Sequence, residues 1–226
     1  MEYISTRDKE KVFSFQDVFL KGLAPDGGLF IPKKIPSLTY QELISYKNLS
    51  YNELALNIIL KFCSDEFDEK DIKEIINNAY KDFRTKEVVE IKKLGNLNLL
   101  ELFHGPTLAF KDIAMQVIGN MYEKILKKNN SKINIVVATS GDTGAAAISA
   151  IKNRSNMKIF VLHPKNKVTE VQRKFMTTVN SSNVFNIAVD SNFDDCQNFV
   201  KLMFADKNFS SSINMSGVNS INWARI

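Results

Sequence analysis

The sequence has few of the residues that build metal sites or disulfide frameworks: it contains two cysteines and two histidines among 226 residues. Cys63 and Cys196 lie far apart in unrelated contexts, so neither a disulfide pattern nor a metal-binding spacing follows from them. No apolar run approaches the length of a membrane-spanning helix, and the N-terminus is too polar for a secretion signal. We therefore expect a cytoplasmic protein with no bound metal and no membrane partner.

Charge of one sign is not concentrated anywhere along the chain. The formal net charge is +5, and the basic residues are interleaved with acidic ones. A nucleic-acid-binding surface needs a clustered basic patch, so no nucleic-acid partner is expected. A modest positive charge does suit small anionic substrates.

The hydrophobic pattern changes near residue 90, so we predict two domains, residues 1–90 and 91–226. Before residue 90, an apolar-spaced stretch over 13–23 precedes a Pro-Gly turn, an extended segment over 29–32, and helices expected over 51–62 and 68–83. After it, strands expected over 97–103, 132–138, 158–162 and 184–189 alternate with helices expected over 111–127, 144–152, 168–179 and 193–205. Such alternation indicates the α/β class, with a parallel sheet wound by helices.

A loop over residues 104–112 has residues suited to amine chemistry. It follows an expected strand, and ligands of open parallel sheets bind beyond the carboxyl ends of the strands. Lys111 falls at or near the start of the next helix, where the positive end of the helix dipole disfavours an ammonium. A neutral lysine amine is what Schiff-base formation with an aldehyde cofactor requires. An ordinary solvated lysine in a first helical turn is the alternative.

A second loop, residues 138–144, follows the strand expected over 132–138 and leads into a helix. Its small and hydroxyl residues would expose backbone N–H groups beside the helix dipole, which favours a phosphate or a carboxylate. A helix cap with a tight turn explains the same residues without any ligand. The loop has neither a Walker ending nor a dinucleotide fingerprint, which opposes a nucleotide-binding module.

Together these motifs resemble one family. His104-Gly-Pro-Thr-x-Ala-Phe-Lys111-Asp112 looks like the segment of the threonine synthases that carries the lysine for pyridoxal phosphate (PLP). Residues 139–144 resemble the substrate-carboxylate loop of the PLP enzymes of fold type II, the tryptophan synthase β-like group. Residues 3–7, 22–32, 171–176 and 219–225 also match the family in kind. The resemblance therefore runs from residue 3 to residue 225.

The resemblance implies a reaction, in which O-phospho-L-homoserine and water give L-threonine and phosphate on PLP. Lys111 would bind the cofactor covalently and then transfer protons, with Phe110 and Asp142 also at the cofactor. The residues implied for substrate binding are Thr139, Ser140, Gly141, Asp142, Thr143, Asn219, Ser220 and Arg225. Arg225 would offer the substrate phosphate a planar fork of donors, although an exposed arginine in a helical first turn is the ordinary alternative. Neither His104 nor His163 receives a role, and the oligomeric state is not implied.

Several other interpretations stay open. One is another fold type II lyase, such as a threonine dehydratase or a threonine-synthase-like phospho-lyase. Another is a non-catalytic module that kept the sheet, which the intact Lys111 and the intact loop over 139–144 oppose. In the family, the residues that hold the cofactor phosphate and face its pyridine nitrogen follow the segment matching 219–225. We therefore expect the C-terminal lobe to be absent, and this chain alone to be inactive.

Overall fold

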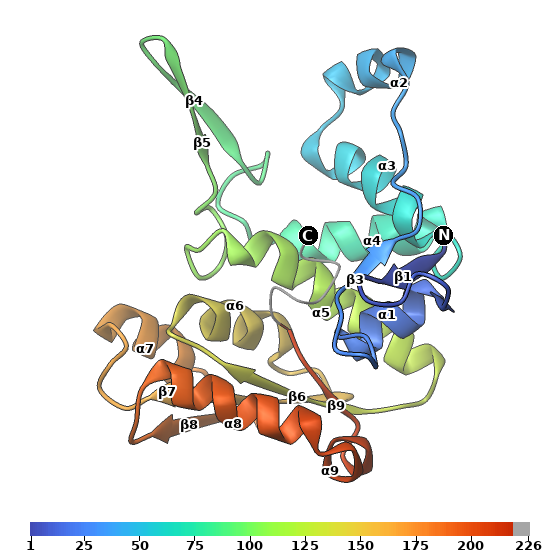
Figure 1. The fold of residues 1–226 in the computed structure, drawn as a ribbon. Helices are drawn as coiled ribbons and strands as arrows, with labels where there is room; N and C mark the ends of the chain where they lie inside the picture. Colours follow the sequence, from blue (N-terminus) through green and yellow to red (C-terminus); the bar gives the residue numbers. More distant parts are fainter. Residues whose placement is uncertain (219–226) are drawn as a thin grey trace.

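The computed structural model describes residues 1–218 (Figure 1). The first part of the chain contains β1 (Tyr3–Ser5), β2 (Val12–Phe13), α1 (Phe15–Lys21), β3 (Phe30–Pro32), α2 (Tyr40–Ser45), the short 3-10 helix η1 (Tyr46–Asn48), α3 (Tyr51–Cys63) and α4 (Glu69–Tyr80). The second part contains β4 (Glu90–Leu94), β5 (Leu97–Glu101), α5 (Lys111–Lys128), β6 (Ile133–Ala138), α6 (Asp142–Ile151), β7 (Met157–Pro164), α7 (Glu170–Thr177), β8 (Val184–Val189), α8 (Phe193–Ala205), α9 (Lys207–Ser212) and β9 (Met215–Ser216).

A four-stranded parallel sheet confirms the predicted α/β class. Its strand order is β8-β7-β6-β9, and every neighbouring pair runs parallel. Helices cover both faces of the sheet. Because alternate residues of a strand point to opposite faces, a single strand contributes to the core on each side. Ile135 and Val137 of β6 pack in the large core with α5 and α6, whereas Val136 packs with Cys196 and Val200 of α8. The sheet is therefore wound on both sides, with α8 on the side opposite α6 (Figure 1).

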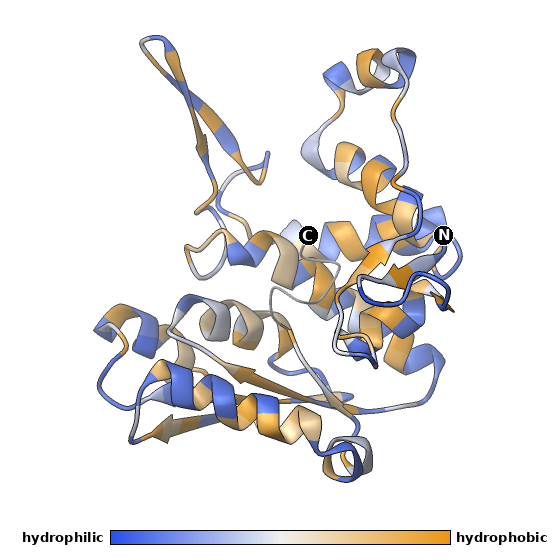
Figure 2. Cartoon of the chain, in the orientation of Figure 1, coloured by the Kyte–Doolittle hydropathy of each residue, from blue (hydrophilic) through white to orange (hydrophobic). Residues whose placement is uncertain are grey.

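The expectation for residues 97–103 was wrong in one respect: this strand does not join the parallel sheet. It forms β5, which pairs antiparallel with β4 in a separate two-stranded hairpin. Leu94 pairs with Leu97 across a two-residue turn, and Gly95 adopts a φ of +61° that favours glycine. The hairpin projects from the rest of the chain in Figure 1 and alternates hydrophilic and hydrophobic residues along its length in Figure 2.

One hydrophobic core joins the two parts of the chain. It contains Phe15 and Phe19 of α1, Ile76 of α4 and Met121 of α5, together with residues of the parallel sheet. The Tyr122 hydroxyl of α5 also donates to the Phe19 carbonyl at 3.2 Å. The division at residue 90 remains a prediction, and the core is continuous across it.

Local capping explains where several helices begin. The Ser50 side chain accepts from the backbone N–H of Glu53 at the start of α3, and the Glu53 side chain accepts in return, as in a capping box. The Asn192 side chain accepts from the backbone N–H of Asp195 at the start of α8. None of the helices in residues 1–218 combines the length and the apolar character of a transmembrane span.

Candidate functional site

Lys111 is the first residue of α5, as its sequence context predicts. Its side chain is 19% exposed, and Nζ lies 4.3 Å from the centre of the Phe110 ring. Lys111 and Phe110 line a shallow cavity of about 200 Å³, together with Leu102, Ile113 and Ala114. The amine is thus partly withdrawn from water, beside an aromatic face and an open space.

The loop before Lys111 is held by a buried carboxylate. Asp112 is fully buried, and its two oxygens accept from the backbone N–H and the hydroxyl of Thr107, each at 2.7 Å. Burial raises the pKa of Asp112, although the hydrogen bonds from Thr107 act in the opposite direction. A Cβ at Gly105 would lie 2.4 Å from the Asp112 Cβ, so only glycine fits there. The loop therefore closes on Asp112 and fixes the position of the neighbouring Lys111.

The loop over residues 139–143 is organised around the Thr139 hydroxyl. Thr139 is 1% exposed, and its Oγ1 accepts from the backbone N–H groups of Gly141 and Gly144, each at 2.9 Å. The Thr139 N–H donates to the Leu162 carbonyl on β7, also at 2.9 Å. Gly141 has a φ of +140°, which residues other than glycine rarely adopt. The hydroxyl of Thr139 thus supports the loop from inside.

The remaining N–H groups of this loop are available to an anion. Helix α6 begins at Asp142, and its N-cap is Gly141, which has no side chain to cap the helix. No residue within 1–218 accepts a hydrogen bond from the backbone N–H of Ser140, Asp142 or Thr143. Uncapped N–H groups at a helix start attract phosphate and carboxylate groups.

The two loops meet at the starts of α5 and α6. Lys111 Nζ lies 4.0 Å from Asp142 Oδ2, and the two helices pack against one another in the core. Because the Asp142 side chain is 45% exposed, this ion pair contributes little to folding stability. The pair does place a carboxylate of the second loop beside the primary amine of the first.

Comparison with known proteins shows what the whole chain is similar to. A family model described as the threonine synthase N terminus matches residues 2–80. A threonine synthase of Pseudomonas aeruginosa is 46% identical over all of this chain and 48% of its own length. A PLP-bound threonine synthase from Brucella melitensis superposes with a TM-score of 0.93 at 45% identity, over all of this chain and 49% of that one. The threonine synthase structure from yeast gives a TM-score of 0.92 at 40% identity, over 99% and 47% of the two chains.

The chain is similar to threonine synthases along its whole length. It spans about half the length of the curated relatives it matches. The residues predicted to bind the substrate phosphate, Asn219, Ser220 and Arg225, lie outside the described residues. Of the residues predicted in the two loops, Phe110 and Asp142 lie beside Lys111.

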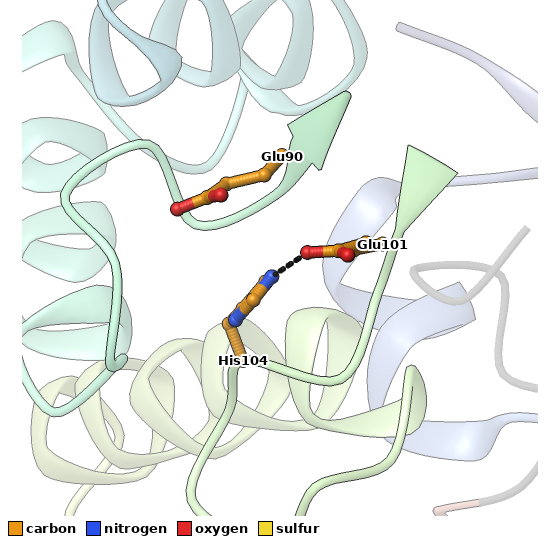
Figure 3. A group of neighbouring side chains, drawn as sticks. All are labelled: Glu90, Glu101 and His104. Carbon is orange, nitrogen blue, oxygen red and sulfur yellow. Dashed lines mark hydrogen bonds and ion pairs between the residues drawn. The ribbon is translucent and has the colours of Figure 1, made fainter. Parts of the chain in front are cut away.

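A cluster of titratable side chains lies where the hairpin meets the lysine loop (Figure 3). The nearest ligand atoms of Glu90, Glu101 and His104 all lie within 4.8 Å of one another. His104 Nε2 is 3.0 Å from Glu101 Oε2, and Glu90 pairs with Lys92, which holds the pKa of Glu90 below its ordinary value. Each of the two carboxylates therefore already has a partner within the protein, His104 for Glu101 and Lys92 for Glu90.

Sequence reasoning gave no role to Gln172, which the structure brings to the site. Gln172 Nε2 donates to Asp142 Oδ1 at 2.7 Å across a gap of 30 residues in the sequence. The motif at 171–176 was part of the family resemblance, but no local pattern indicated which of its residues would reach the loop. His163, the other unassigned histidine, is buried on β7.

Proposed function

We propose that the full-length protein is a threonine synthase that converts O-phospho-L-homoserine and water to L-threonine and phosphate, with PLP as cofactor. The observation that carries the proposal is the meeting of Lys111 and Asp142, 4.0 Å apart, at the starts of two packed helices. Support comes from 46% identity to a threonine synthase and from the likeness to a structure described as PLP-bound.

The residues around Lys111 fit an aldehyde cofactor. A partly buried amine beside an aromatic ring and a cavity is placed to bond an aldehyde carbon covalently. When bound, PLP withdraws electrons from the substrate and so makes its protons easier to remove. Lys111 would then accept and return protons at the substrate carbons, and Phe110 and Asp142 would lie at the edge of the cofactor.

The loop over 139–143 fits the substrate carboxylate. Within residues 1–218, the N–H groups of Ser140, Asp142 and Thr143 have no acceptor, and the last two lie in the first turn of α6. The Thr143 hydroxyl would add a further donor. Thr139 and Gly141 would act through the shape of the loop, since the Thr139 hydroxyl already accepts from two backbone groups. We assign the substrate phosphate to Asn219, Ser220 and Arg225, on the donor chemistry of their side chains.

Two coarser features belong to the same proposal. We infer that residues 1–90 form the N-terminal domain of the family and residues 91–226 part of its PLP-binding domain. A cytoplasmic location is in keeping with the free, buried thiols of Cys63 and Cys196, because thiols persist in reducing compartments.

Product analysis tests the reaction directly. The full-length protein is supplied with PLP and O-phospho-L-homoserine, and the products are separated. L-Threonine and phosphate in equal amounts are the expected result. The chain is also 40% identical to a protein named threonine synthase-like 2 from Xenopus laevis, so a related lyase activity is the second candidate. Formation of 2-oxobutyrate would favour that candidate, and the absence of both products would refute the proposal.

A further inference from the structure

Gln172 reaches from α7 to the carboxylate that faces Lys111. Its amide nitrogen donates to Asp142 Oδ1 at 2.7 Å, while the other oxygen of Asp142 lies 4.0 Å from Lys111 Nζ. Two charged residues of α5 interact with Asp142: Lys111, and at longer range Asp112, whose raised pKa includes a contribution from the Asp142 charge. Gln172 is a neutral donor to the same carboxylate.

The orientation of the Gln172 amide is fixed by its own helix. Thr169 caps α7, accepting from the Gln172 backbone N–H at 3.4 Å, and its hydroxyl donates to Gln172 Oε1 at 2.8 Å. With the amide oxygen so engaged, the amide nitrogen is the atom that faces Asp142. This assignment agrees with chemistry, because an ionised carboxylate only accepts hydrogen bonds.

Gln172 also packs over the loop at its tightest point. A Cβ added at Gly141 would lie 2.5 Å from Gln172 Cδ and 2.6 Å from Oε1. The glycine and the glutamine thus fit one another: Gly141 leaves the space, and the Gln172 side chain fills it. The same side chain supports the loop and holds its one acidic group.

We propose that Gln172 is a positioning residue of the Lys111 site, which holds the Asp142 carboxylate beside the amine and fixes the loop over 139–143. This inference rests on the proposed function and assigns to that site a residue from α7. Loss of the amide donor leaves the Asp142 carboxylate free to turn away from Lys111, whereas the fold keeps its core, because Gln172 is not a core residue.

Variants of the full-length protein separate the hydrogen bond from the packing. Gln172→Glu keeps the shape and replaces the donor with an acceptor, whereas Gln172→Met keeps the bulk over Gly141 without a donor. Lys174→Ala is the matched control, since Lys174 is an exposed residue of α7 that pairs with Glu170. Each variant is measured for kcat and KM with O-phospho-L-homoserine, for the thermal midpoint and for PLP content.

We expect Gln172→Glu to lower kcat about tenfold or more at pH 8, as for the loss of a charge-assisted hydrogen bond, with an unchanged thermal midpoint. A glutamate beside Asp142 binds a proton more readily than a free glutamate, and once protonated it donates again. Its kcat relative to wild type should therefore recover severalfold between pH 8 and pH 6. The kcat of Gln172→Met relative to wild type should be low and independent of pH. Lys174→Ala should match wild type at every pH measured.

A second measurement does not depend on turnover. In Gln172→Glu a second carboxylate near Lys111 favours the ammonium, so borohydride-trapped labelling of Lys111 by PLP should be severalfold slower at pH 8 than in wild type. If the wild-type protein formed no threonine, the proposed function would be contradicted. The rates at which PLP labels Lys111 would then be the test of the role inferred for Gln172. The inference is overturned if Gln172→Glu behaves like Lys174→Ala both in kcat and in the rate of Lys111 labelling. Losses that merely follow a lowered thermal midpoint also overturn it, since they show a structural role.

Discussion

Substitution of Asp112 tests whether a buried carboxylate holds the loop that presents Lys111. Asp112→Ala removes both acceptors and leaves the N–H and the hydroxyl of Thr107, itself 8% exposed, without partners in a buried site. Asp112→Asn keeps the shape, and its amide satisfies both groups: the oxygen accepts from the N–H, and the nitrogen donates to the hydroxyl. The two variants therefore differ in hydrogen bonding far more than the small change in size suggests.

The expected cost follows from the two orphaned groups. A buried polar group left without a partner costs about 1–3 kcal/mol, so the two orphaned groups of Asp112→Ala should destabilise the fold by roughly 2–6 kcal/mol. For a chain of this length, about 3 kcal/mol corresponds to a fall of roughly 6–12 °C in the thermal midpoint. Asp112→Asn should cost less than about 1.5 kcal/mol, because it loses the charge of the acceptor but leaves no group unpaired.

Thermal and urea unfolding followed by circular dichroism measures both variants against wild type. Equal losses in Asp112→Ala and Asp112→Asn would refute the reasoning, because they would show that charge or volume matters and not the pairing with Thr107. Unchanged stability of both would show that the loop does not depend on Asp112 at all.

The same residue gives a pH dependence of defined sign. Burial raises the pKa of Asp112 in the folded chain above the value of about 3.9 of an unfolded aspartate. The folded chain then binds this proton more tightly than the unfolded chain, so Asp112 lowers the free energy of unfolding as pH rises between the two pKa values. Asp112→Asn should remove this loss, so its stability relative to wild type should improve from pH 4 upward. A relative stability that stays flat with pH would contradict the raised pKa.

The remaining predictions concern substrate binding by the full-length protein. Thr143→Val should raise the Kd for O-phospho-L-homoserine roughly tenfold, the factor for losing one hydrogen bond to a charged group, and change PLP affinity little; equal losses of both would point to a role at the cofactor alone. Arg225→Ala should raise KM by about 100-fold and abolish competitive inhibition by inorganic phosphate, since the planar donor pair is lost; inhibition as strong as in wild type would exclude Arg225 from the phosphate site.

Local sequence signals anticipated much of the α/β half of the fold. The bounds of β8 and α8 coincide with the predicted ranges, because Asn192 marks the helix start and the strand is a short run rich in β-branched and aromatic residues. The hairpin of β4 and β5 was missed, although Gly95-Asn96 is a two-residue turn signal, because the second strand alone resembles one that precedes a helix in a parallel sheet.

Local sequence signals also predicted part of the site. Lys111 lies at the start of α5 as predicted, whereas Asp142, expected in the loop before a helix over 144–152, is the first residue of α6. Two contacts were not predicted from the sequence: that of Gln172 with Asp142, and that of His104 with Glu101. The first joins residues 30 apart and depends on the fold, whereas the second joins residues only three apart, just after the end of β5.

The central claim is that Lys111 is the residue that carries the cofactor, and trapping with borohydride tests it most directly. The protein is incubated with PLP, reduced with borohydride, digested, and its lysines are mapped by mass spectrometry. We predict one pyridoxyl adduct, on Lys111, together with a visible absorbance band that disappears on reduction; Lys111→Ala should show neither. A stoichiometric adduct on a different lysine, or an undiminished band in Lys111→Ala, would contradict the account.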